Sequence, residues 1–154
     1  MKKITLTVLG LSVLLFTLAG CSKNNTKKQT ETDHQLILNY ITSHNLKGQF
    51  TSSGLYYVIL KSGNAKHPTL SSTLDTDYKG YFLDGKVFDQ GTGVSFPLSR
   101  VIKGWQEILP LMPTGAKWKI VIPPQLAYGE RGAGGLIGPN ETLIFEIELI
   151  SIDK

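Results

Sequence analysis

The sequence predicts an α+β fold, in which a curved antiparallel β-sheet wraps around one short α-helix. Apolar and polar residues alternate in most segments between residues 53 and 152, which is the period of a half-buried strand. The pair Asp84-Gly85 predicts a tight hairpin between two antiparallel strands. Residues 96–112 are the one segment of the body with helical spacing, so the strand–helix alternation that builds a parallel sheet is missing.

The first twenty residues have the pattern of an export signal. Lys2 and Lys3 precede an apolar run that is shorter than the ~20 residues needed to span a bilayer. The run ends in small residues at LAGC, residues 18–21, which resembles the bacterial lipobox. We therefore expect a lipoprotein signal peptide over residues 1–20 and a lipid anchor on Cys21, the only cysteine in the chain. The protein would then be exported and anchored to the bacterial cell envelope, on its periplasmic or outer-surface side.

The segment after the signal is polar. Residues 22–32, SKNNTKKQTET, contain no apolar side chain, so residues 21–32 are expected to form a flexible tether. The full chain has a net charge of +4, but residues 33–154 hold eleven basic and eleven acidic residues and are neutral. A neutral domain gives no support for a nucleic-acid partner. The tether lysines would lie favourably over acidic lipid head groups.

Residues 33–52 are expected to form a short helical segment ahead of the main domain. Four apolar residues share one stripe of a helix over residues 33–45, and Asp33 is a suitable N-cap. The stripe consists of Leu36, Ile37, Tyr40 and Ile41. A helix of about 13 residues is near the length at which an isolated helix is marginal in water. We therefore expect it to pack on its own domain, and the domain to be a monomer.

The main domain is expected over residues 53–154. The segments with strand patterns are 53–63, 73–89 (divided in two by the hairpin), 115–124 and 141–152. In the helical segment, Trp105, Ile108, Leu109 and Met112 share a face. Pro110 limits this helix to about two turns. The prediction is four or five antiparallel strands and one short helix.

Most ordinary catalytic chemistry is disfavoured by the sequence. His34, His44 and His67 all precede the body of the domain, and none is at ligand spacing from another. No cysteine remains to act as a thiolate once Cys21 is acylated. The glycines of residues 129–138 do not complete a dinucleotide-binding fingerprint. We therefore expect no metal and no cofactor, and spacing alone does not identify a function.

Four segments carry a more specific signal: DYKGYFLDGKVFD, FPLSRVIKGW, GAKWKIVIPPQLAYGERG and PNETLIFEIEL. Together they resemble the FKBP-type peptidyl-prolyl cis-trans isomerases, and the resemblance covers residues 53–152. It implies a half-barrel of antiparallel strands around a short helix, with an apolar pocket that holds a proline. It also implies an isomerase of X–Pro bonds that assists folding of exported or envelope proteins. Its partners would be proline-containing segments of unfolded or exported proteins, and macrolide inhibitors such as rapamycin.

The resemblance also implies which residues form the site. The implied catalytic residues are Tyr78, Phe88, Asp89, Tyr128 and Phe145, and the implied substrate-binding residues are Val101, Ile102, Trp105, Leu136 and Ile137. Asp89 would be a buried carboxylate and Trp105 the floor under the proline ring. The Ile102 N–H and the Tyr128 hydroxyl would hydrogen-bond the substrate. Leu136 and Ile137 would grip an apolar ligand from a loop that overhangs the pocket.

Simpler interpretations remain open for these residues. Trp105 and Phe145 would be core residues in any sheet packed on a helix, Tyr78 and Tyr128 could be surface aromatics, and Asp89 a turn cap. The chain could also be a module that captures proline-containing or unfolded segments without turnover, or a lipoprotein that assembles envelope complexes.

Three departures from the family pattern bear on substrate preference and inhibitor affinity. The segment QGTGVS is short and trims a flap over the pocket, Gly138 replaces a frequent proline, and Thr76 replaces an apolar residue.

Overall fold

A six-stranded antiparallel sheet, with the strand order β1-β2-β5-β6-β3-β4, is the main feature of the computed structural model. The structure describes residues 21–64 and 66–153, so the predicted signal peptide lies outside the described residues. The strands are β1 (Gln49–Phe50), β2 (Tyr56–Lys61), β3 (Thr73–Phe82), β4 (Val87–Pro97), β5 (Lys117–Ile122) and β6 (Leu143–Asp153). The predicted α+β class with an antiparallel, curved sheet is confirmed.

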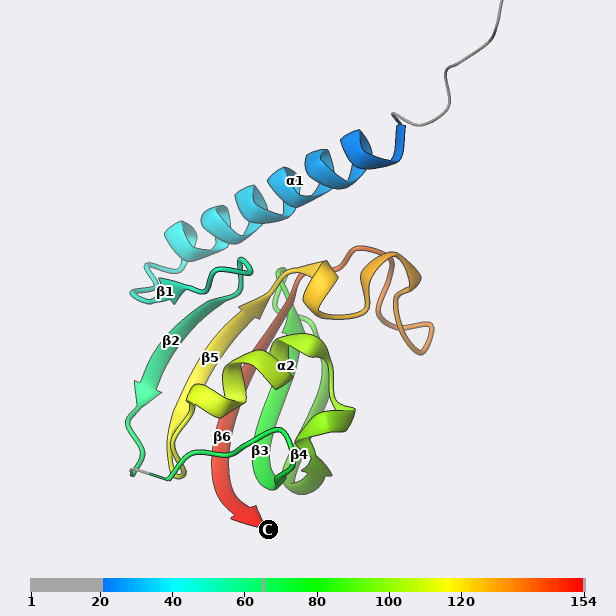
Figure 1. The fold of residues 1–154 in the computed structure, drawn as a ribbon. Helices are drawn as coiled ribbons and strands as arrows, with labels where there is room; N and C mark the ends of the chain where they lie inside the picture. Colours follow the sequence, from blue (N-terminus) through cyan, green and yellow to red (C-terminus); the bar gives the residue numbers. More distant parts are fainter. Residues whose placement is uncertain (1–20, 65, 154) are drawn as a thin grey trace, which may run out of the picture.

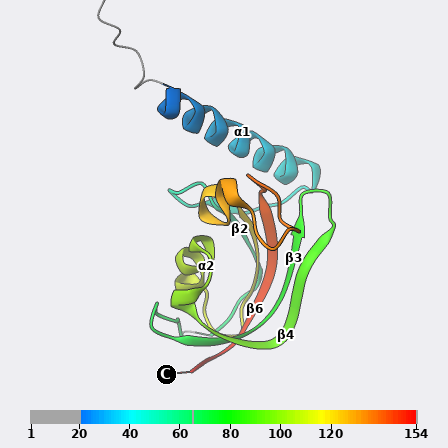
Figure 2. The ribbon, with the colours of Figure 1, turned by 90° about the vertical axis from the view of Figure 1, so that its right-hand side faces the viewer.

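The sheet curves around α2 (Lys103–Ile108), which lies against its inner face (Figure 1; Figure 2). A short 3₁₀ helix, η2 (Leu109–Leu111), follows α2, because Pro110 has no N–H to continue the α-helical hydrogen bonds. Gly104 lets α2 approach the sheet closely, since a Cβ on this residue would lie 2.7 Å from Ile122 Cγ2. The prediction that this helix would be short is confirmed.

The main core fills the space between α2 and the inner face of the sheet. The two central strands contribute alternate residues to it: Trp118, Ile120 and Ile122 from β5, and Leu143, Phe145, Ile147 and Leu149 from β6. Between these residues, Glu146 and Glu148 form ion pairs with Lys119 and Lys61 at the other face. This is the period-two pattern by which the sequence predicted half-buried strands.

The β3–β4 hairpin turns at the predicted Asp84-Gly85 pair. Gly85 has a φ of 86°, in the left-handed region that glycine adopts without steric cost. The Phe82 N–H donates to the Lys86 carbonyl at 2.9 Å and closes the turn. β4 then continues to Pro97, beyond the predicted end at residue 89, because the polar and glycine-rich QGTGVS pairs with β3 without an alternating apolar pattern.

An N-terminal helix, α1 (Cys21–Ser43), lies across one end of the sheet (Figure 1; Figure 2). Ile37 and Tyr40 pack with Tyr56, Val121 and Ile144 in a second hydrophobic cluster. Val121 and Ile144 alternate with residues of the main core, so α1 covers part of the outer face of the sheet. Within the described residues, no helix is long and apolar enough to cross a membrane.

The structure differs from the predicted flexible tether over residues 21–32, because α1 begins at Cys21 and has 23 residues. Residues 27–32 are exposed, whereas the second half of α1 packs on the domain. The lack of apolar side chains before residue 33 therefore indicates a solvated helix, not an absence of helix.

Asp33 is not an N-cap, since it lies within α1. With Ile37 and Tyr40 it has i, i+4, i+7 spacing and shares their stripe. Its side chain is 2% exposed, and its Oδ1 accepts a hydrogen bond from Gln29 Nε2 at 2.7 Å. Burial raises the pKa of Asp33, and the hydrogen bond from Gln29 acts against this shift.

Candidate active site

A cleft of about 410 Å³ opens at the inner face of the sheet, beside α2. The residues that line it are Tyr78, Phe88, Asp89, Val94, Phe96, Arg100, Val101, Ile102, Trp105, Tyr128 and Phe145. They come from β3, β4, β6, α2, the loop after β5 and the segment between β4 and α2, which includes the 3₁₀ helix η1 (Leu98–Arg100). Eight of the ten site residues implied by the resemblance therefore meet in one cleft.

Trp105 is the centre of an aromatic cluster in this cleft. Its ring centroid lies 5.5 Å from that of Tyr78, 5.2 Å from Phe96 and 5.1 Å from Phe145. The Tyr78 and Phe145 rings meet it edge-on, each at an interplanar angle of 81°, a favoured geometry for aromatic pairs. Trp105 and Phe145 are each 5% exposed. The cleft therefore has an apolar wall held by mutual ring contacts.

Gly80 on β3 makes room for two of these rings. A Cβ at this position would lie 2.7 Å from Phe88 Cε2 and 2.8 Å from Phe145 Cε1. Phe88 and Phe145 themselves pack edge-on, with ring centroids 5.4 Å apart. The glycine of DYKGYF is thus required by packing beside the cleft.

Tyr78 and Asp89 are joined by a hydrogen bond in the cleft. Tyr78 Oη donates to Asp89 Oδ2 at 2.9 Å. Burial, followed by the hydrogen bond and the charge of Asp89, raises the pKa of Tyr78 to about 12, so its hydroxyl stays protonated at neutral pH. The expectation of a buried carboxylate is wrong, because Asp89 is exposed on β4, an edge strand of the sheet.

Tyr128 and Ile102 border the cleft with polar groups. Burial and the charge of Asp89 raise the pKa of Tyr128, so it too remains a neutral hydroxyl. Ile102 is the N-cap of α2, and its carbonyl accepts the N–H groups of Trp105 and Gln106 at 3.0 and 3.1 Å. Its own N–H has no hydrogen-bond partner within the described part of the chain.

Leu136 and Ile137 do not line this cleft. Leu136 is 51% exposed and lines a separate groove of about 380 Å³ beside the β3–β4 hairpin, whereas Ile137 packs against the main core. The Ala133 N–H donates to the Ile137 carbonyl at 2.9 Å and the Ile137 N–H to the Ala133 carbonyl at 3.0 Å. This tight turn folds the tip of the loop back on itself, so the expected grip by both residues is not present.

Three lining residues were not predicted: Val94, Phe96 and Arg100. Phe96 opens the motif FPLSRVIKGW and could have been included on that basis. Arg100 lies in the same motif, as the last residue of η1, and Val94 lies in β4 directly after a glycine-rich stretch. Neither the 3₁₀ helix nor that stretch has a period that assigns a side chain to one face.

A second cleft, of about 470 Å³, lies between α1 and the loops around Ser53 and Pro123. It is larger than the aromatic cleft, but His34 is its only ring-bearing residue besides Pro123, so it offers no stacked aromatic wall. Among the described residues, no group of three or more His, Cys, Asp or Glu side chains could hold a metal ion. The aromatic cleft is therefore the best candidate active site.

The chain is similar to several known proteins over the same region. It is 50% identical over 107 residues to the peptidyl-prolyl cis-trans isomerase Mip of Coxiella burnetii, a match that covers 67% of this chain and 46% of that protein. It is 45% identical over 106 residues to the FKBP-type 22 kDa peptidyl-prolyl cis-trans isomerase of Escherichia coli, covering 66% and 52%. The chain thus spans about half the length of these curated relatives.

Solved structures of peptidyl-prolyl cis-trans isomerases are also similar to this chain. A peptidyl-prolyl cis-trans isomerase from Pseudomonas syringae pv. tomato superposes with a TM-score of 0.71 at 38% identity, covering 81% of this chain and 96% of that one. FkpA from Escherichia coli superposes with a TM-score of 0.72 at 36% identity, covering 85% and 63%. The family model for FKBP-type peptidyl-prolyl cis-trans isomerases matches residues 64–150. With its curved sheet, short helix and aromatic cleft, the chain belongs to the FKBP-type peptidyl-prolyl cis-trans isomerase family.

Proposed function

We propose that this protein is a peptidyl-prolyl cis-trans isomerase, which accelerates rotation about X–Pro bonds in unfolded or exported proteins. The observation that carries the proposal is the aromatic cleft, with Trp105 in contact with Tyr78, Phe96 and Phe145. A cleft of about 410 Å³ is large enough for a proline ring and its neighbouring peptide groups.

The reaction suits a site without a nucleophile. Rotation about a peptide bond faces a barrier of roughly 18–20 kcal/mol, because twisting the bond breaks amide resonance. No covalent bond has to form or break, so the enzyme need only bind the twisted amide better than either planar form. Twisting reduces charge separation in the amide and makes its carbonyl depend less on water, and an apolar cleft favours this change.

Several of the lining residues then have a proposed role. Trp105 supports the proline ring, and Phe88 and Phe145 enclose it. The Tyr128 hydroxyl and the Ile102 N–H hold substrate carbonyl groups, since both are donors at the cleft that have no hydrogen-bond partner among the described residues. Tyr78 forms a wall whose hydroxyl is oriented by its hydrogen bond to Asp89.

A matched pair of substitutions tests this function. Phe88→Ala removes a cleft ring that is only half-buried, and we expect kcat/KM on a prolyl peptide to fall about tenfold, which corresponds to ~1.4 kcal/mol. Phe50→Ala is the control, because Phe50 lies on β1, is 37% exposed and does not line the cleft. Rates come from a protease-coupled assay and are checked by exchange NMR without protease. Binding of a prolyl peptide with no acceleration would assign the chain instead as a binding module.

We also propose that the protein is exported and lipid-anchored through Cys21, where it assists folding in the envelope. The support is the LAGC motif at residues 18–21, ahead of an α1 whose residues 27–32 are exposed and include Lys27 and Lys28. Cys21→Ser should give an unprocessed or soluble protein with an intact domain. A processed Cys21→Ser variant that still fractionates with membranes would contradict the anchor.

The protein is proposed to be a monomer, because two residues of the apolar stripe of α1, Ile37 and Tyr40, are already buried against its own domain. Sedimentation should give a monomer mass at all concentrations, and a concentration-independent dimer would contradict this.

A macrolide such as rapamycin is proposed to bind the aromatic cleft, and competition with a prolyl peptide would test it. Protection of an aggregating client by a variant without isomerase activity would separate a chaperone role from catalysis.

A further inference from the structure

The cleft lining contains two charged residues, Arg100 and Asp89. Asp89 Oδ2 already accepts a hydrogen bond from Tyr78 Oη, at 2.9 Å. Arg100 is exposed, and neither of the two ion pairs among the described residues includes it. The cleft thus presents one cation whose guanidinium has no hydrogen-bond or ion-pair partner within the described part of the chain.

The backbone around Arg100 is held in place. Arg100 is the last residue of η1 and is followed directly by Val101 and Ile102, which also line the cleft. On either side of Arg100, Gln106 Nε2 donates to the carbonyl of Ser99 at 3.3 Å and to that of Val101 at 2.7 Å. The Arg100 side chain therefore starts from a fixed point on the cleft wall, two residues before Ile102, whose N–H is proposed to hold the substrate.

A guanidinium group matches a carboxylate with two parallel N–H donors. Apart from Asp89, the other lining residues are aromatic or aliphatic and distinguish poorly between an acidic and a neutral substrate. We infer that Arg100 is a specificity-determining residue, which favours substrates with an acidic side chain within two positions of the proline. The inference rests on the proposed isomerase function and narrows its substrate class to acidic prolyl segments.

The size of the effect follows from the exposure of Arg100. A solvent-exposed ion pair changes an equilibrium by about two- to fivefold, so we expect a preference of that order in kcat/KM. The pair forms with the planar and the twisted amide alike, so it lowers KM and leaves kcat unchanged. Salt screens exposed charges, and the preference should shrink as ionic strength rises.

Pairs of prolyl peptides test the inference. The two peptides of a pair differ only in having Glu or Gln at one position, and that position is varied over the two before and the two after the proline. Exchange NMR without protease avoids the charge preference of a coupling enzyme. The wild type should prefer Glu about two- to fivefold at one position or more. Arg100→Lys should keep this preference, Arg100→Gln should remove it, and Arg100→Glu should invert it.

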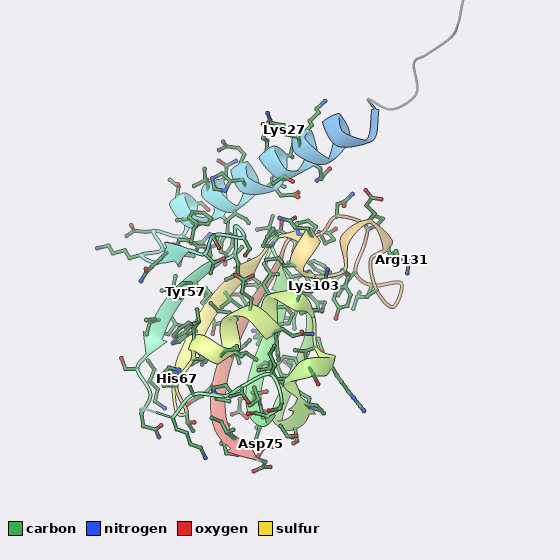
Figure 3. The ribbon with its side chains drawn as sticks, viewed as in Figure 1. Lys27, Tyr57, His67, Asp75, Lys103 and Arg131 are labelled. Carbon is green, nitrogen blue, oxygen red and sulfur yellow. The ribbon has the colours of Figure 1, made fainter. Side chains whose placement is uncertain are left out.

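The chain has two arginines, and the second provides the control. Arg131 is exposed on the loop after β5 and does not line the cleft (Figure 3), so Arg131→Glu changes the net charge equally and should keep the Glu preference. Equal kcat/KM for the Glu and Gln peptides at all four positions would overturn the role of Arg100. The same loss of the Glu preference in Arg131→Glu as in Arg100→Glu would also overturn it. A wild type that accelerates none of the peptides would refute the isomerase proposal itself, and this inference with it.

Discussion

Gly80→Ala tests directly whether the packing of two cleft rings determines both stability and activity. The substitution adds one methyl group on β3, where a Cβ would lie 2.7 Å from Phe88 Cε2 and Cζ and 2.8 Å from Phe145 Cε1. Carbon atoms in favourable contact are about 3.5–4.0 Å apart, so one or both rings must move by roughly 1 Å. Phe145 is 5% exposed and lies between Trp105 and Phe88, so Phe88, which is half-buried, is the ring that gives way.

The expected cost is that of overpacking, about 1–3 kcal/mol in the free energy of unfolding. Because Phe88 lines the cleft, its displacement also changes the cleft, and kcat/KM on a prolyl peptide should fall. The control is Gly138→Ala on the loop after β5. Its nearest neighbour would be Glu141 Oε1 at 3.4 Å, and we expect that change to be neutral or slightly stabilising, because alanine restricts the unfolded chain.

Urea unfolding and exchange NMR give the two readouts. A double-mutant cycle makes the test specific, since Phe88→Ala removes the closest obstacle. In that background Gly80→Ala should cost clearly less, with a coupling of about 0.5 kcal/mol or more. Additive effects of the two substitutions, or a Gly80→Ala variant with unchanged stability and activity, would refute the proposed packing.

Three further predictions concern the same cleft and its surroundings. Trp105→Ala and Phe145→Ala should abolish most activity and lower the free energy of unfolding by about 3–5 kcal/mol, because both rings are buried, which melting temperature and kcat/KM would report. Thr76→Val should stabilise the domain by about 1 kcal/mol in urea unfolding, because the Thr76 hydroxyl is buried without a hydrogen-bond partner among the described residues. The isomerase rate should stay level from about pH 6 to 8.5, because neither cleft tyrosine loses its proton in this range. The pKa of Tyr78 is raised to about 12, and that of Tyr128 is also raised above the usual ~10. A bell-shaped profile centred near neutrality would instead indicate proton transfer. Because the pKa of each tyrosine is higher in the folded protein than in the unfolded chain, their contribution to stability is fully present below about pH 10 and is lost as pH rises further.

The fold could be predicted from the sequence wherever buried and exposed residues alternate regularly along the chain. β5 and β6 present alternate residues to the core, and that alternation is visible in the sequence. Most of the site was predictable through the family motifs, because Trp105 and Phe145 are core residues whose positions follow from the strands and the helix that carry them. The exposure of Asp89 was not predictable in this way, because it depends on β4 being an edge strand, which is a property of sheet order.

The two larger differences, α1 and the loop tip, have a common cause. Residues 27–32 are helical but solvated, so no apolar stripe marks them, and a helix continuous with a docked segment need not be stable alone. Leu136 is apolar but points to a groove outside the cleft, because backbone hydrogen bonds between Ala133 and Ile137 set the turn. In both segments hydrophobicity was a poor guide, since the backbone conformation is set by hydrogen bonding and not by burial.

The position of α1 has a consequence for a membrane-anchored isomerase. α1 packs on the outer face of the sheet, whereas the aromatic cleft is on the inner face beside α2. A helix of 23 residues is about 34 Å long, and Ile37 and Tyr40 in its second half pack on the domain. Figure 3 shows Lys27 on the part of α1 that extends away from the domain. If Cys21 carries the lipid, the helical residues between Cys21 and the docked part of α1 would hold the bilayer away from the domain by about 1.5 Å each. The helix would then act as a spacer that leaves the cleft open to polypeptide in the surrounding water.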